Sequence, residues 1–316
     1  LLYGLTGVLI FSEISKVLLV TNLATSPAAL LSVMLILAGI GFKISVVPFH
    51  SWAPDTYEGA PLPVTAYLSV SSKATGFVAL MIILTKVFPD SGSSWGIVLV
   101  IISGLTMFIG NLSALQQSNP VRLLAYSSIA QAGFILAPLA VAGISGNYAD
   151  GIYASVTYLI IYAFMNIGAF LVVNVLINTS GSHNIYEWGG LSKHQPLTAV
   201  FATVFFFSLA GIPPLGGWFA KFVVFRSLLS TGEVYGITLA IIGAINAVIG
   251  LVFYARISKI IWMDTPSENI TVNTKPTLLG PLKVVAFISL AVTFIAGIFP
   301  NIFSNLGNAS ALFFNS

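Results

Sequence analysis

The chain has 316 residues, of which 57% are hydrophobic and 7% are charged. Soluble domains are roughly one quarter charged, so the composition excludes an ordinary soluble domain and predicts a polytopic membrane protein. The net charge of +3 is spread along the chain without a basic cluster, and no nucleic-acid partner is expected. With no cysteine and three scattered histidines, the chain is not expected to hold an iron–sulfur cluster, haem or zinc.

The first apolar segment, residues 1–11, is too short to cross a bilayer and has no initiator methionine or basic region before it. We therefore expect an N-terminally truncated chain that begins inside a helix, with no signal peptide. Apolar blocks of roughly membrane-spanning length follow. They lie at residues 27–48, 62–87, 95–115, 121–142, 151–178, 197–229, 234–263 and 281–299.

These blocks are continuously apolar rather than alternating, which excludes a transmembrane β-barrel. The predicted fold is all-α, a polytopic transmembrane helical bundle of about nine helices by the length criterion. Residues 1–316 are expected to form one domain with upstream helices missing.

Two of the predicted spans are interrupted. The block at 27–48 runs into Pro48 and Pro54, and the block at 197–229 contains Pro213 and Pro214 between glycines. Proline removes a backbone donor, so each break must face protein or water. Both spans contain the letters LAGI, at 37–40 and 209–212. This match suggests an internal repeat around a midplane site, with chance similarity as the alternative.

Lys43, Lys73 and Lys221 lie inside these apolar blocks, and no acidic residue does. A lysine near the bilayer centre costs roughly 3 kcal/mol, which favours a functional reason for each. Lys73 is near the middle of its span, whereas Lys43 and Lys221 lie closer to the breaks and can also be interfacial anchors. Three buried cations without an acid are either held neutral or meet carboxylates from a segment outside this chain.

Such lysines suit proton transfer because burial disfavours the charged form and a nearby carboxylate restores it. His50, two helical turns after Lys43, would share its face on an unbroken helix and act as a relay, with a structural loop histidine as the alternative. Asp55 and Glu58 are interpreted as carboxylates of a loop capped by turn chemistry, with the gathering of protons as the alternative. Hydroxyl groups expected to accompany Lys73 come from Tyr67, Ser71, Ser72 and Thr75.

Longer motifs carry a family resemblance. They are GFKISVVPFHSWAPDTYEGAP at 41–61, SSK at 71–73, RLLAYSSI at 122–129 and SLAGIPPLGGWFAKF at 208–222. Together they resemble the antiporter-like membrane subunits of respiratory complex I, the proton-translocating NADH:quinone oxidoreductase. A lysine rather than a glutamate at position 221 makes the subunit N branch the most similar. The resemblance covers nearly the whole chain and implies an antiporter-like, inverted-repeat fold with two discontinuous helices.

The resemblance also implies roles for single residues. Lys43, Lys73 and Lys221 match lysines assigned to proton transfer in the family, and His50 lies in the same motif. The family's glutamate partner for the lysine at position 43 lies on an earlier helix that is absent from this chain. Gln131 stands where many relatives carry a histidine, so water is expected to pass protons there.

The function implied by the resemblance is to carry protons across a membrane, coupled to quinone reduction elsewhere in the complex. No cofactor is expected in this chain, and NADH, FMN, iron–sulfur clusters and quinone are expected in partner subunits. The expected partners are the other membrane and peripheral subunits of a complex I-like assembly, together with the lipid bilayer. The expected location is a bacterial inner membrane, with organellar inner and thylakoid membranes as alternatives.

Other functions stay open at this point. Within the superfamily they are a subunit of an Mrp-type cation/proton antiporter or of a membrane-bound hydrogenase. From other classes they are a small-solute carrier or a structural membrane arm. The lysines lack a substrate-sized set of polar neighbours, which disfavours a carrier, and their number disfavours a purely structural role.

Overall fold

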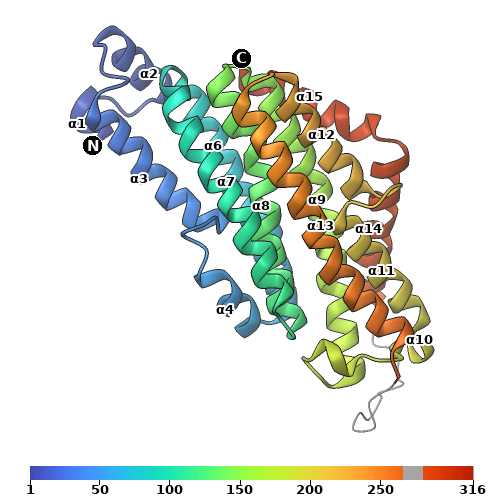
Figure 1. Ribbon diagram of the computed structural model, residues 1–316. Helices are drawn as coiled ribbons and strands as arrows, with labels where there is room; N and C mark the ends of the chain where they lie inside the picture. The colour runs from blue at the N-terminus through green and yellow to red at the C-terminus, as the bar shows by residue number, and fades with distance from the viewer. Residues whose placement is uncertain (266–279, 316) are drawn as a thin grey trace.

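The computed structural model describes residues 1–265 and 280–315, and all its regular elements there are helices (Figure 1). The prediction of an all-helical bundle is confirmed. The α-helices are α1 (Leu2–Thr6), α2 (Phe11–Val20), α3 (Pro27–Ile44), α4 (Trp52–Gly59), α5 (Leu62–Tyr67), α6 (Lys73–Lys86), α7 (Gly92–Leu115), α8 (Pro120–Ser145), α9 (Tyr148–Ser180), α10 (Leu191–His194), α11 (Pro196–Ala210), α12 (Gly216–Ser230), α13 (Val234–Met263), α14 (Gly280–Ile298) and α15 (Asn301–Asn315). A π-helical turn, Leu68–Ser72, joins α5 to α6.

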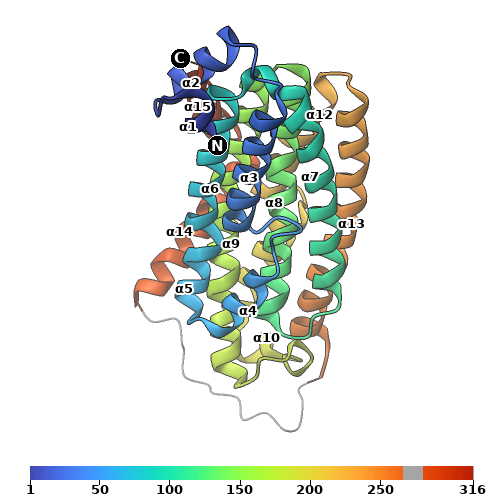
Figure 2. The same ribbon diagram turned by 90° about the vertical axis from the view of Figure 1, so that its left-hand side faces the viewer.

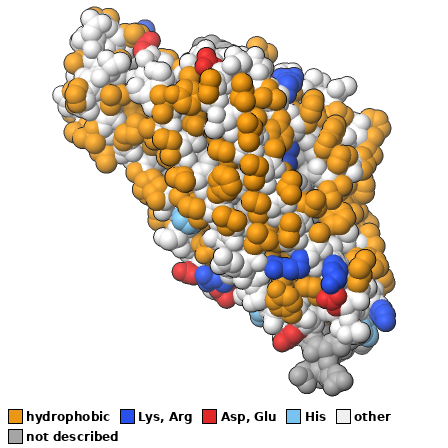
Figure 3. All heavy atoms as spheres, in the orientation of Figure 1, with side chains coloured by type: hydrophobic (Ala, Val, Ile, Leu, Met, Phe, Trp, Pro, Cys, Tyr) orange, Lys and Arg blue, Asp and Glu red, His pale blue; other side chains and the backbone are white. Residues whose placement is uncertain are grey.

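Six helices of the described residues are long and apolar enough to cross a membrane, and α14 with α15 forms a further pair bent by 87°. Figure 3 shows a broad belt of hydrophobic side chains over the long helices, with most charged side chains towards the two ends of the molecule. These features are those of a multi-pass integral membrane protein.

Two segments differ from the sequence-based prediction. Residues 1–11 form the five-residue helix α1, which ends at Gly7, instead of part of a span. The chain also continues past the last predicted span into α15. This helix was not predicted because its polar and apolar residues are mixed and do not form a uniformly apolar block.

Local sequence explains where several long helices begin. α3, α8 and α11 each carry a proline at the first helical position, where the missing N–H has no intrahelical partner to lose. Ser26 and Asn119 cap α3 and α8 with their side-chain oxygens. Each such start fixes the end of a long apolar helix.

The centre of the bundle is α8, which has 94% of its most apolar stretch buried and therefore faces protein rather than lipid. It packs against α7, α9 and α12. A Cβ atom at Gly133 would lie 2.9 Å from the backbone nitrogen of Met107, so glycine lets α7 and α8 approach closely.

The first predicted break is confirmed. α3 ends at Ile44, and Ser45 follows with a left-handed φ of 58°. The freed backbone groups find partners inside the protein: the Val47 amide donates to Thr106 Oγ1 on α7 at 3.0 Å. Figure 2 shows the chain leaving α3 and re-forming as α4 towards the same end of the bundle as α10.

The second predicted break is also confirmed, between Ala210 at the end of α11 and Gly216 at the start of α12. The letters LAGI do not mark equivalent places in the two broken spans. At 37–40 they lie within α3, whereas at 209–212 they run across the end of α11.

Candidate functional site

Lys73 is the first residue of α6, and its side chain is buried, with 2% of the residue exposed. Its ammonium nitrogen Nζ donates to the Ser128 hydroxyl Oγ at 2.8 Å and to the Ser128 carbonyl oxygen at 2.9 Å, both on α8. No ion pair among the described residues includes Lys73. Lys73 can donate to both of these neutral acceptors as a charged ammonium or as a neutral amine, because each form carries at least two N–H groups.

The π-helical turn before Lys73 is held by α9. Asn166 Nδ2 donates to Ser69 Oγ at 2.8 Å, and both side chains are buried. A π turn inserts a residue relative to an α-helix and so resets the direction of the side chains that follow it. Lys73 is the next residue, so the turn helps to direct its side chain towards α8.

The hydroxyl groups expected around Lys73 are not its partners. Thr75 Oγ1 bonds to the Ser71 carbonyl at 2.9 Å within its own helix, and Tyr67 is 63% exposed. Those hydroxyl groups are near Lys73 in sequence and lie on the same helical segment, whereas the side chain of Lys73 reaches across to α8. Ser128 lies in the RLLAYSSI motif, and its distance along the chain from Lys73 leaves no sequence signal of this contact.

Lys221 lies on α12 and is also buried, with 6% of the residue exposed. Its Nζ donates to the carbonyl oxygens of Ala210 at 2.6 Å and Leu209 at 3.2 Å. These are the last carbonyls of α11, which the helix break leaves without backbone partners and which form the negative end of the helix dipole. Nζ also lies 5.1 Å from the centre of the Phe134 ring.

Gly211 is needed for this arrangement. Its backbone φ of +94° is one that residues with a side chain rarely adopt. A Cβ atom at this position would lie 2.8 Å from Lys221 Cδ. The break therefore creates both the free carbonyls and the space for the lysine that binds them.

Gln131 joins the surroundings of the two lysines. Its Nε2 donates to the Leu209 carbonyl at 3.1 Å, the same oxygen that accepts from Lys221. Its Oε1 accepts from the Tyr158 hydroxyl on α9. Gln131 lies three residues after Ser128, so the two share one face of α8. The polar row thus runs from Lys73 through Ser128 and Gln131 to Lys221.

Lys43 stands outside this buried row. It lies in the last turn of α3 and is exposed, contrary to the expectation of a buried cation. A Cβ atom at Gly76 would lie 3.1 Å from Lys43 Cγ, so its stem touches α6 one turn after Lys73. Among the described residues its Nζ has no hydrogen bond or ion-pair partner. A cation on an otherwise apolar face of α3 needs a partner from elsewhere.

His50 does not share a helix face with Lys43, because α3 ends at Ile44. The relay geometry expected for an unbroken helix is therefore wrong. Burial lowers the pKa of His50 from its ordinary value of 6.5, so the imidazole is neutral at pH 7.

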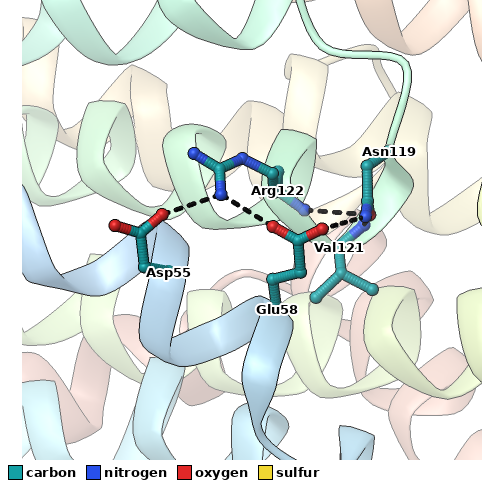
Figure 4. Close-up of polar contacts among 5 residues, drawn as sticks. All are labelled: Asp55, Glu58, Asn119, Val121 and Arg122. Carbon is teal, nitrogen blue, oxygen red and sulfur yellow. Dashed lines mark hydrogen bonds and ion pairs between the residues drawn. The ribbon is translucent and has the colours of Figure 1, made fainter.

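Asp55 and Glu58 lie on the helix α4 and not in the expected loop. Arg122 Nη1 contacts Asp55 Oδ1 and Glu58 Oε2, each at 2.7 Å, and Asn119 Nδ2 donates to Glu58 Oε1 at 2.8 Å (Figure 4). This cluster ties α4 to the start of α8. Arg122 stands in the RLLAYSSI motif, and its carboxylate partners are too far away along the chain for the sequence to reveal the cluster.

Comparisons with known proteins agree with the expected resemblance. Residues 1–250 match the profile of the family described as NADH:quinone oxidoreductase/Mrp antiporter, TM. The chain is 38% identical to NADH-quinone oxidoreductase subunit N of Heliobacterium modesticaldum over 98% of its length, and 39% identical to that of Moorella thermoacetica over 99%. It spans 62% and 63% of these two relatives, respectively.

The fold has close counterparts among solved structures. A chain of the Mrp complex from Dietzia sp. superposes with a TM-score of 0.85 at 23% identity, covering 98% of this chain and 63% of that one. Such identity supports the fold alone. Together with the profile match over most of the chain, these similarities show that the chain belongs to the NADH:quinone oxidoreductase/Mrp antiporter transmembrane family.

Proposed function

We propose that this chain is the proton-carrying part of subunit N of an NADH:quinone oxidoreductase. The observation that carries the proposal is the polar row across the bundle centre, in which Lys73 and Lys221 are buried at either end of Ser128 and Gln131. Among the described residues, each of these lysines donates hydrogen bonds to neutral acceptors and contacts no carboxylate. Each can therefore release and regain a proton without breaking a buried ion pair.

In this proposal protons move along the row between Lys73 and Lys221. Serine and glutamine do not titrate at working pH, so Ser128 and Gln131 orient hydrogen bonds while bound water carries the proton between the lysines. Lys43 of α3 is a third station, because its stem touches α6 at Gly76, one turn after Lys73. Its charge is set by an acidic group outside this chain. His50 lies within the break between α3 and α4, away from the row.

The energy for this movement comes from partner subunits. We propose that NADH, FMN, iron–sulfur clusters and quinone are bound there, in the membrane and peripheral parts of the assembly, and that this chain takes no part in electron transfer. Its contribution is proton movement across what we propose to be a bacterial inner membrane. The similarity to subunit N relatives supports this choice over an Mrp-type antiporter.

The test uses the assembled complex that contains the full-length protein, in sealed inverted membrane vesicles. The Lys73→Ala variant should reduce quinone with NADH while losing most acidification of the vesicle interior. Lys193→Ala is the matched control, because Lys193 is exposed on α10, and it should pump normally. Undiminished pumping by the Lys73→Ala complex would refute the role of Lys73. Sodium-dependent exchange without any link to quinone reduction would favour the antiporter.

A further inference from the structure

A cavity of about 390 Å³ opens at one end of the bundle between α9, α12 and α15. Its polar lining comes from Asn147, Asp150 and Tyr153 around the start of α9, Arg226 on α12 and Asn308 on α15. Leu312 of α15 adds an apolar wall. The proton-transfer row does not use any of these residues, so this inference stands independently of the proposed function.

The two charged residues of the cavity lie near the ends of their helices, as expected where a bilayer changes from hydrocarbon to head groups. Asp150 is in the first turn of α9, and Arg226 is about one turn before the end of α12. α15 bends by 87° from α14, and in Figure 1 it lies at the end of the bundle where the chain terminates. Leu312 and Phe313 are each 72% exposed on this helix, as expected for a helix at a membrane interface.

A single ion pair occupies the cavity wall. Arg226 Nη2 contacts Asp150 Oδ1 at 3.1 Å, and the guanidinium carbon lies 5.1 Å from the centre of the Tyr153 ring. The side chain of Arg226 is 52% exposed, and its other guanidinium nitrogens have no hydrogen-bond partner among the described residues. Arginine has five N–H donors, so Arg226, which lines the cavity, keeps donors for a ligand.

The wall therefore presents one positive and one negative group side by side, with an apolar surface next to them. The complementary ligand is a zwitterionic lipid head group: its phosphate accepts from Arg226, and its ammonium donates to Asp150. Phosphatidylcholine has no N–H to donate, and phosphatidylglycerol brings no cation for the Asp150 carboxylate. Lipid phosphate lies deeper than the ammonium, and Arg226 lies further from its helix end than Asp150 does.

We propose that this cavity binds one molecule of phosphatidylethanolamine, with its phosphate at Arg226, its ammonium at Asp150 and its acyl chains along the apolar side of α15. The lipid then links α15 to the ends of α9 and α12.

The test is photoaffinity labelling of the assembled complex in phosphatidylcholine vesicles that contain a trace of diazirine-bearing phosphatidylethanolamine. Mass spectrometry should locate the label on peptides covering residues 147–153 or 308–312. Replacing part of the phosphatidylcholine with unlabelled phosphatidylethanolamine should lower the labelling, with an affinity roughly tenfold above that of phosphatidylcholine, the ratio expected for one charge-assisted hydrogen bond. Replacing the same part with phosphatidylglycerol should leave the labelling unchanged. No label on these peptides, or equal competition by the two added lipids, would overturn the proposal.

Variants sharpen the result. Arg226→Gln and Asp150→Asn should each lower labelling by roughly tenfold, whereas Lys16→Gln, at an exposed position on α2, should leave it unchanged. The double variant Asp150→Arg with Arg226→Asp keeps an ion pair but reverses its order. It should not regain labelling, and full recovery would contradict the assigned orientation. If a variant fails to assemble, the lipid competition on the unaltered complex still tests whether the cavity prefers phosphatidylethanolamine.

Discussion

Lys221 and Gln131 donate to the same acceptor, the carbonyl oxygen of Leu209, at 3.2 and 3.1 Å. This carbonyl is free because α11 ends at the following residue. The helix break and the central helix α8 therefore meet at one oxygen atom. A change in the position or protonation of Lys221 therefore alters the hydrogen bond that Gln131 donates to that shared acceptor.

Removing the amide of Gln131 should weaken this connection. Gln131→Leu keeps the side-chain volume similar but loses two buried hydrogen bonds, to the Leu209 carbonyl and from the Tyr158 hydroxyl. The bond to Leu209 is the link to Lys221 and is worth about 1 kcal/mol, so proton pumping should slow by roughly fivefold. Gln131→His restores a polar and titratable group and should recover the rate with a new dependence on pH. The measurement is the initial rate of vesicle acidification between pH 6 and pH 8. Equal rates for the leucine variant and the unaltered complex would rule out the bridging role.

Gly211→Ala should damage the Lys221 site specifically. A methyl group there meets Lys221 Cδ at 2.8 Å, and the backbone φ of +94° adds strain of roughly 1–2 kcal/mol. We expect a lower melting temperature and a loss of pumping.

Gly146→Ala is the control for the backbone strain alone. Gly146 has a φ of +77° but no atom within 4 Å of the added methyl group. It should lower the melting temperature through strain alone, and therefore by less than Gly211→Ala does, and leave pumping per quinone reduced intact. If both variants pump equally well, the position of Lys221 does not matter for function.

The Arg122 cluster should contribute modestly to stability. Arg122→Gln leaves Asp55 and Glu58 without their cation, and partly exposed pairs of this kind are worth about 1 kcal/mol or less. The melting temperature should fall by a few degrees at low salt and by less at high salt, because salt already screens the pairs. A loss that does not depend on salt would show that packing, and not charge, joins α4 to α8.

His50 gives a stability effect with a defined sign. Its pKa is lowered from 6.5 in the folded protein, so below about pH 6.5 the unfolded chain binds a proton that the folded chain does not. Stability should therefore fall as the pH drops below that value, and His50→Gln should reduce the slope. The measurement is the melting temperature of both complexes from pH 7.5 to pH 5.5. A steeper slope in the glutamine variant would show that the assumed burial is wrong.

The sequence was sufficient for the long apolar helices, both breaks and the burial of Lys73 and Lys221, because hydrophobic length and proline act locally. It was not sufficient for the contact between Lys73 and Ser128, or for the link from Asn166 to Ser69, because these residues are far apart in the chain. Such partners depend on how the helices pack.

Lys43 shows a different limit. Its position in an apolar block indicates burial, yet the described residues leave it exposed on α3. The apolar pattern of a segment predicts the average burial of a helix, but it does not predict whether one face of that helix is covered by other parts of the protein. Similarly, α15 escaped prediction because its mixed polar and apolar residues do not form a uniformly apolar block.

The most direct test of proton transfer is the number of protons moved per quinone reduced in the complex carrying Lys73→Arg. Arginine keeps a positive charge and hydrogen-bond donors for Ser128 but does not release its proton in proteins. We predict that this complex assembles and reduces quinone while moving clearly fewer protons per quinone than the unaltered complex. An unchanged ratio would contradict the assignment of Lys73 as a group that gains and loses a proton.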